Sequence, residues 1–340
     1  MTPTRGADQG TETGLRSREP FRSAAESAGP IFVVGAPRSG TTLLRVILSS
    51  HSRLYIPPES DFIPRLFLRR ARAPMTAALA ERNLRIVLGN RRFLREWHAP
   101  PPDPAAFVAS LPELTPAAFL DALYGAYAAE HGALRWGDKS PIYTNYVGLL
   151  AEIFPNAKFV HLIRDGRDAA LSALRAYRDR FYVDIYWAAR SWKRRVLAAR
   201  RAGAGLAPGR YFEMRYEELT TEPEGTLRRV CRFLGEPYEA TMCEQHELGQ
   251  ELLRPHGRHA AVRQPLRPNS GKWRREMPLA DQTLFQSVAG DLLLELGYEQ
   301  AVVGRMTVYE RTRYARLATK YHVLEGGRRV LQAFGVFHPH

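Results

Sequence analysis

The stretch Gly35–Thr42, which reads Gly-Ala-Pro-Arg-Ser-Gly-Thr-Thr, is the feature that most constrains the fold. It follows an apolar run at 31–35 and precedes a stretch at 42–50 with a helical pattern. Glycine at both ends of the loop, Gly35 and Gly40, permits a tight turn, and successive backbone N–H groups at the start of a helix attract an anion. The order of strand, glycine-rich loop and helix therefore predicts an α/β domain with an anion-binding loop.

Two further strands are predicted over 158–163 and 210–215, and helical patterns occupy 167–178, 185–202 and 222–234. Strands that alternate with helices indicate right-handed βαβ units and a parallel sheet. The fold class that we expect is α/β: a P-loop-like, three-layer domain with a central parallel sheet and a helical insert or lid.

The chain divides into three parts. Residues 1–29 are rich in Thr, Ser, Gly, Arg and Glu and lack the apolar segment of a secretory signal, so we expect a disordered tail. Residues 30–300 form the main domain, in which 60–135 is mostly helical and is interpreted as a lid or acceptor-binding layer. Residues 301–340 form a basic and aromatic helical extension that is divided at Gly326-Gly327.

The formal net charge of +14 over 340 residues favours anionic partners, such as nucleotides, nucleic acid, phosphorylated or sulfated substrates, or anionic lipid. The two cysteines, Cys231 and Cys243, give neither a metal-ligand spacing nor a disulfide framework. No apolar run reaches the roughly 18–20 residues that cross a membrane. These observations predict a reducing, cytoplasmic location.

The glycine spacing of the loop matches that of nucleotide triphosphatases, but Thr41 stands where those enzymes have a lysine. Without that lysine, a triphosphate loses the cation that bridges its β- and γ-phosphates. Arg38 places a cation elsewhere in the loop. The pattern therefore favours a single 5'-phosphate that carries a transferable group.

Besides an enzyme that transfers a group from such a 5'-phosphate, the sequence leaves two other functions open. A P-loop kinase of a small molecule needs the missing lysine and also a carboxylate where Arg164 ends the second strand. A non-catalytic basic protein that binds nucleotides or nucleic acid fits the charge, but the sequence contains no known nucleic-acid-binding motif. We therefore expect no specific nucleic-acid partner.

Gly35–Thr42 resembles the 5'-phosphosulfate loop of sulfotransferases that use 3'-phosphoadenosine-5'-phosphosulfate (PAPS). The continuation through Thr41–Arg45, His51 and Pro58–Pro64 is similar to the tyrosylprotein sulfotransferase branch and its bacterial relatives. The likeness covers most of 31–300 in patches. It implies a sulfotransferase domain over 30–300 in the cytoplasm of a bacterium, transfer of a sulfuryl group from PAPS to a hydroxyl or amine, and PAP (3'-phosphoadenosine-5'-phosphate) as the product. The sequence has no Asp, His or Cys cluster that indicates a metal.

The resemblance implies three catalytic residues. Glu59 is the general base that takes the acceptor proton, while Arg38 and Lys139 stabilise charge on the leaving phosphate. Position alone leaves open a solvated loop carboxylate at Glu59 and a surface lysine at 139. His51 is a rival base, although a core or helix-terminal histidine explains it as well.

The resemblance also implies the donor-binding residues. The 5' side is held by Pro37, Arg38, Ser39, Gly40, Thr41 and Thr42. The 3'-phosphate is held by Arg164 and Ser172, since arginine presents a bidentate fork to phosphate; a salt bridge from Arg164 to Asp168 is the alternative. A loop that closes over the nucleotide contributes Ser270, Gly271 and Lys272. Tyr216 either flanks the adenine or packs in the core.

The acceptor is not defined by a motif, and a small molecule, a lipid, a sugar and a peptide all remain open. Four aromatic residues either line the acceptor pocket or pack in the core: Trp97, Tyr124, Tyr127 and Tyr143. The basic, aromatic segment 304–340 leaves a peripheral membrane contact and a homodimer open.

Overall fold

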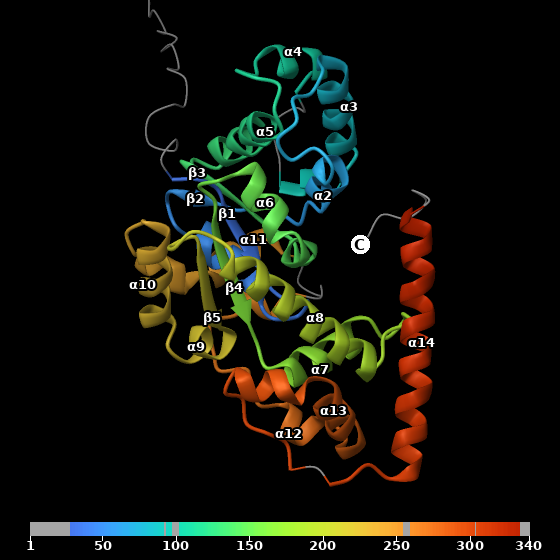
Figure 1. Ribbon diagram of the computed structural model, residues 1–340. Coiled ribbons are helices and arrows are strands. Elements are labelled where there is room, and N and C mark those ends of the chain that lie inside the picture. The colour runs from blue at the N-terminus through green and yellow to red at the C-terminus, as the bar shows by residue number, and fades with distance from the viewer. Residues whose placement is uncertain (1–27, 92, 97–101, 254–258, 303, 334–340) are drawn as a thin grey trace, which may run out of the picture.

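The computed structural model describes residues 28–91, 93–96, 102–253, 259–302 and 304–333 (Figure 1). Most of the tail expected over 1–29 lies outside these residues, and so does Trp97. Gly29 and Pro30, which precede the first strand, are buried.

The described residues form a parallel sheet of five strands in the order β2-β3-β1-β4-β5. The strands are β1 (Ile31–Val34), β2 (Leu54–Tyr55), β3 (Arg135–Lys139), β4 (Lys158–Ile163) and β5 (Tyr211–Arg215). The predicted central parallel sheet is confirmed. Strands β2 and β3 were not predicted, because neither forms an apolar run of ordinary strand length.

Strand β1 lies at the centre of the sheet between β3 and β4. The register pairs Val33 with Lys139 on one side and with Val160 on the other. In a parallel sheet the carboxyl ends of neighbouring strands meet at one edge, where ligands bind. The loop after β1, Lys139 at the end of β3 and Arg164 just after β4 therefore share this edge.

Helices cover both faces of the sheet (Figure 1). The helices are α1 (Thr41–Ser49), α2 (Phe62–Phe67), α3 (Ala77–Leu88), α4 (Pro104–Ala109), α5 (Pro116–Glu130), α6 (Val147–Ile153), α7 (Gly166–Ala176), α8 (Ile185–Ala204), α9 (Tyr216–Thr221), α10 (Pro223–Leu234), α11 (His246–Leu252), α12 (Trp273–Glu276), α13 (Leu279–Glu295) and α14 (Val308–Ala333). Single 3-10 turns are η1 (Phe93–Glu96), η2 (Pro141–Asn145), η3 (Ala240–Glu244) and η4 (Ala260–Arg263). Residues of α1 and α10 pack on one face, and residues of α5, α6 and α8 pack on the other.

The helical region between β2 and β3 packs as a continuation of the sheet core. Phe62, Phe93 and Tyr124 pack against one another, and the Tyr124 ring stacks on Trp136 of β3 at 4.6 Å. The prediction of a mostly helical segment over 60–135 holds as far as Glu130, after which the chain enters β3.

The C-terminal helix α14 stands beside the domain in Figure 1 and contacts it through α8. Tyr314 and Tyr321 of α14 pack edge-on against Tyr186 of α8. The expected division at Gly326-Gly327 is wrong, because the helix continues through both glycines. No described helix combines the length and the apolar character that crossing a membrane requires.

Gly166 begins α7 in a place with no room for a larger residue. A Cβ there would lie 2.6 Å from atoms of both Trp192 and Phe285. We expect Gly166→Ala to lower the free energy of unfolding by about 1–3 kcal/mol, because overpacking forces a rigid core to shift. Urea titration followed by circular dichroism measures this.

Gly148 in α6 is the matched control, since a Cβ there would meet nothing within 4 Å. Gly148→Ala should raise the free energy of unfolding by about 0.4–1 kcal/mol through the entropy of the unfolded chain. Equal unfolding free energies for the two variants would contradict the account of Gly166.

Candidate active site

Hydrogen bonds and glycine geometry fix the loop between β1 and α1. The N–H of Gly35 donates to the Thr144 hydroxyl at 2.9 Å, and that hydroxyl donates to the Gly35 carbonyl at 2.9 Å. Gly40 has a φ of 97°, and a Cβ on it would lie 2.4 Å from the Tyr216 ring. Only glycine satisfies both constraints.

Arg38 also lies in the left-handed region, with a φ of 69°. Such a conformation costs a non-glycine residue about 1–2 kcal/mol and persists only where the surroundings impose it. The Arg164 guanidinium supplies one such constraint, because its Nη1 donates to the Arg38 carbonyl at 3.2 Å. The Arg38 side chain donates from Nε to the Ser172 hydroxyl at 3.1 Å. The two predicted anion sites are thus joined through Arg38.

Lys139 and Glu59 form an ion pair beside this loop. Nζ of Lys139 lies 2.7 Å from Oε1 of Glu59 and 3.1 Å from Oγ1 of Thr42. Lys139 is 2% exposed and Glu59 is 25% exposed. The sequence left open a surface lysine at 139 and a solvated carboxylate at 59, and the structure places the two side chains together at the first turn of α1.

Burial lowers the pKa of Lys139, and the Glu59 carboxylate opposes that shift. His259 lies in the same electrostatic environment and had no sequence motif to mark it. Burial and the positive charges of Lys139 and Arg38 lower the pKa of His259 to about 4. His259 is therefore neutral near pH 7. His51, the rival base, instead contacts the Pro237 carbonyl at 2.8 Å and accepts from the Arg53 amide at 3.0 Å.

Arg164 follows β4 and is 7% exposed. Its Nη2 donates to the Asn269 carbonyl at 2.8 Å, and its guanidinium lies 4.3 Å from the centre of the Tyr216 ring. Tyr216 is buried beneath Arg164 and Gly40, which is the packing alternative of the sequence analysis.

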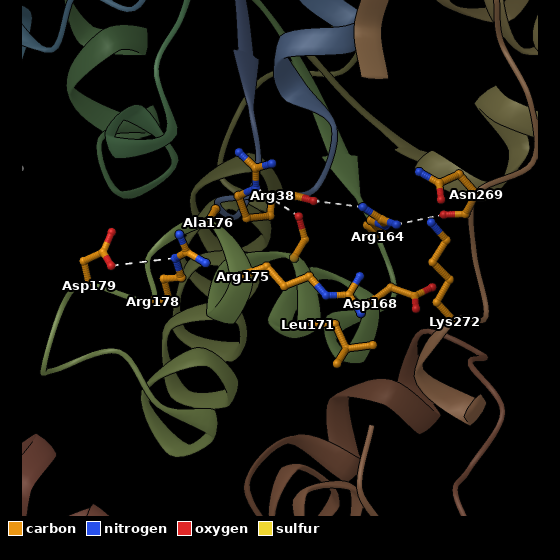
Figure 2. A pocket seen from close by; sticks show the side chains of 11 residues that line it. Arg38, Arg164, Asp168, Leu171, Arg175, Ala176, Arg178, Asp179, Asn269 and Lys272 are labelled. Atoms are coloured by element: carbon orange, nitrogen blue, oxygen red, sulfur yellow. Dashed lines mark hydrogen bonds and ion pairs between the residues drawn. The ribbon is translucent and has the colours of Figure 1, made fainter. Parts of the chain in front are cut away.

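A polar pocket of about 480 Å³ opens beside Arg164 (Figure 2). Its lining includes five cationic side chains and two carboxylates: Arg38, Arg164, Arg175, Arg178, Lys272, Asp168 and Asp179. Ser172 and Asn269 also line it. Excess positive charge around a solvent-filled hollow suits a phosphate.

Asp168 holds the predicted closing loop in place. Its carboxylate accepts from the Gly271 amide at 2.6 Å and from the Trp273 amide at 3.0 Å. Burial raises the pKa of Asp168, while these two amides oppose the shift. Lys272 lines the pocket, whereas Ser270 is exposed and the Gly271 amide is engaged by Asp168.

The structure therefore brings most of the predicted residues to one edge of the sheet. Ser39, Thr41 and Thr42 are buried in the loop, and the Ser39 hydroxyl has no hydrogen-bond partner among the described residues. Pro37 belongs to the same loop. Tyr124, Tyr127 and Tyr143 are fully buried, so they are core residues and do not line an open pocket. Within the described ranges, no three His, Cys, Asp or Glu side chains gather as metal ligands.

Residues 30–240 match the model of the sulfotransferase family. An uncharacterised protein of Aquifex aeolicus (strain VF5) is 31% identical over 263 residues, which are 73% of this chain and 31% of that protein. Protein-tyrosine sulfotransferase 1 of Danio rerio is 26% identical over 279 residues, which are 79% of this chain and 72% of that protein. The chain thus spans less than a third of the Aquifex protein's length.

The fold is similar to that of the sulfotransferase domain from the Synechococcus PCC 7002 olefin synthase. The TM-score is 0.55 at 24% identity, and the match covers 82% of this chain and 99% of that domain. This likeness agrees with the α/β fold and the central parallel sheet described above.

Replacing Asp168 should release the closing loop. In Asp168→Ala, the amides of Gly271 and Trp273 lose a charged acceptor, and hydrogen bonds to charged groups contribute about 1.5–3 kcal/mol each. We expect hydrogen exchange at 268–273 to accelerate by about tenfold or more. Hydrogen–deuterium exchange read by mass spectrometry measures this, with Asp179→Ala, an exposed carboxylate of the same pocket, as the control. Unchanged exchange in Asp168→Ala would contradict this role.

Proposed function

Because this chain belongs to the sulfotransferase family, we propose that it transfers the sulfuryl group of PAPS to a hydroxyl or amine of an acceptor. One observation carries the proposal. The loop after β1 and the pocket at Arg164 after β4 lie on neighbouring strands and each suits an anion, and the Glu59–Lys139 ion pair lies beside the loop. PAPS has an anionic group at each end, so it needs two such sites.

The residues present fit the two ends of this donor. The pocket lined by Arg164, Ser172 and Lys272 suits the 3'-phosphate, since its lining is cationic and polar. The loop 37–42 suits the 5' side, because it leads into the first turn of α1, where the N-terminus of a helix favours an anion. The unpartnered hydroxyl of Ser39 agrees with a ligand at this loop.

Glu59 acts as the general base in this proposal. Its carboxylate oxygen Oε1 lies 2.7 Å from Nζ of Lys139, and a carboxylate is a group that can accept a proton from an acceptor hydroxyl or amine. Glu59 takes the acceptor proton while the acceptor atom bonds to sulfur and the bond from sulfur to the phosphate oxygen breaks. Proton transfer of this kind contributes about 10²–10⁴-fold to a rate.

Lys139 and Arg38 act on the leaving phosphate. Lys139 stands at the Thr42 hydroxyl, at the first turn of α1, where negative charge grows as the bond to sulfur breaks. Arg38 is anchored to Ser172 on the 3' side and also contributes positive charge near His259. Fixed cations of this kind stabilise the transition state without reorganising.

The proposal names the acceptor only by its chemistry. It is a small molecule, lipid, sugar or peptide that offers a nucleophilic oxygen or nitrogen. The Danio rerio relative is named a protein-tyrosine sulfotransferase, so a phenolic hydroxyl is the first acceptor to test. Independence from metal and a cytoplasmic location remain predictions.

We expect PAP to bind with and without Mg²⁺ and ATP to bind weakly, because the loop has Thr41 in place of the triphosphate-binding lysine. Isothermal titration calorimetry of both nucleotides, with EDTA or Mg²⁺, measures this. Tight Mg²⁺-dependent ATP binding without PAP binding would favour a kinase and sink the sulfotransferase proposal.

Two substitutions should separate binding from chemistry. Arg164→Ala should weaken PAP binding about 10–100-fold, since it removes a charged donor that contributes about 1.5–3 kcal/mol. Glu59→Gln should leave PAP affinity within about twofold and lower the transfer rate about 100-fold or more. Radiolabelled PAPS with a panel of phenols, sugars and lipids supplies the rate measurement.

The matched controls are Arg228→Ala and Glu224→Gln, a surface pair on α10 that should change neither quantity. If Arg164→Ala binds PAP normally, Arg164 is not part of the 3' site. If Glu59→Gln loses PAP affinity, Glu59 has a structural role.

A further inference from the structure

A fully buried polar cluster lies directly behind the Glu59–Lys139 pair. Its members are Ser60, Tyr124, Asp138 and Tyr143, each 0% exposed. The Ser60 hydroxyl donates to Oδ2 of Asp138 at 2.6 Å and lies 2.5 Å from the Tyr143 hydroxyl. The Tyr124 hydroxyl bonds both to Ser60, at 3.0 Å, and to Asp138.

Burying this cluster costs free energy, because it removes a carboxyl group from water. Burial raises the pKa of Asp138 to about 6, against the opposing effect of its hydroxyl donors. The surroundings are aromatic, with Phe62 and Phe93 against Tyr124, and apolar side chains would fill the same space without desolvating a carboxylate. Oδ2 of Asp138 takes the hydroxyl donors, whereas its Oδ1 has no hydrogen-bond partner among the described residues. Such a buried polar network contributes a defined geometry more than net stability.

The cluster is joined to the catalytic pair by the chain itself. Ser60 directly follows Glu59, and Asp138 directly precedes Lys139. Successive side chains of a strand leave on opposite faces. The register pairs Asp138 with Phe32 and Lys139 with Val33, and these two β1 residues belong to the separate cores on the two faces of the sheet.

The Glu59–Ser60 segment therefore contacts β3 from both sides. Ser60 binds Asp138 on the face of β3 that packs against α5, and Glu59 binds Lys139 on the face that carries α1. The Asn90 side chain adds a third tether, since its Nδ2 donates to the Ser60 carbonyl at 2.6 Å. With Ser60 fixed in this way, the Glu59 carboxylate has little freedom to leave the lysine.

We propose that Ser60 and Asp138 are positioning residues whose hydrogen bond holds the Glu59 carboxylate at Lys139 and so sets the geometry of the proposed base. The inference rests on the proposed function, because the role of base belongs to that proposal. Neither Ser60 nor Asp138 is placed to contact a substrate, since both are fully buried.

The test reads the Glu59–Lys139 contact without a substrate. An amine reacts with acetic anhydride only in its neutral form, so a change in the acetylation rate of Lys139 between variants reports a change in its protonation. The rate is read by mass spectrometry on the nucleotide-free protein. Losing an opposite charge at contact distance lowers the pKa of a buried lysine, so a larger fraction of the amine is neutral at a given pH. Lys158, on β4, is the internal reference.

We expect Ser60→Ala to raise the Lys139 rate, relative to Lys158, toward the roughly tenfold increase expected for Glu59→Gln. Ser60→Ala leaves the charges of Arg45 and Asp138 and the neutral His259 side chain, which also face Lys139, unchanged. In the Glu59→Gln background, Ser60→Ala should add nothing, because its effect passes through the carboxylate. Ser191→Ala, another buried serine in α8, should leave the rate unchanged.

Three results would overturn the inference. The first is an unchanged Lys139 rate in Ser60→Ala, and the second is a rise caused by Ser60→Ala that is as large in the Glu59→Gln background as in the wild type. The third is an equal rise at Lys158, which would indicate that the whole fold has loosened. Asp138→Asn removes a charge that itself faces Lys139, so this variant is compared in two backgrounds. It should raise the Lys139 rate more in the wild-type background than in Glu59→Gln, because the direct charge effect is present in both and the positioning effect only in the first. PAP binding is measured separately, so failure of the donor proposal and failure of this inference give different results.

Discussion

Two cations are buried at the carboxyl ends of strands on either side of β1, and the rest of the site is organised around offsetting the cost of burying them. Lys139 is 2% exposed and Arg164 is 7% exposed. Removing an ammonium or a guanidinium from water costs several kcal/mol, which only close acceptors offset. Glu59 and Thr42 supply them for Lys139, and the carbonyls of Arg38 and Asn269 supply them for Arg164. The anion loop, the helical insert and the closing loop are therefore tied to the sheet by the same two residues.

Apolar strands and glycine geometry made part of this arrangement predictable. The runs at 31–35, 158–163 and 210–215 became β1, β4 and β5, and Gly40 has a positive φ that fits the tight turn predicted for its loop. Strand β3 was missed because Arg-Trp-Gly-Asp-Lys has no apolar run, although all five residues are buried. Its charges reach partners far along the chain: Arg135, for example, bonds to the Gly29 carbonyl and to Glu236.

The site was predicted in the same uneven way. The roles of Glu59, Lys139 and Arg164 came from a family resemblance, and their proximity became visible only in the structure. The expected alternative for Arg164, a salt bridge to Asp168, gave way to carbonyl contacts, because Asp168 binds the amides of the closing loop. His259 carried no signal in the sequence, and Asn269 lay in the predicted closing loop without an expected role. The Asn269 carbonyl accepts a hydrogen bond from Arg164, and His259 lies near the positive charges of Lys139 and Arg38. Both arrangements arise only when the chain folds.

Strand order also determines how nucleotides would be told apart. The proposed 5' and 3' sites follow β1 and β4. These strands pair directly with each other, from Ile31 opposite Lys158 to Val34 opposite His161. Neighbouring strands lie about 4.8 Å apart, and a buried parallel sheet does not stretch. The separation of the two sites is therefore a constant of the scaffold. The site would therefore select a ligand by the distance between its two anionic ends. A nucleotide with all its negative charge at one end would occupy only one of the two sites.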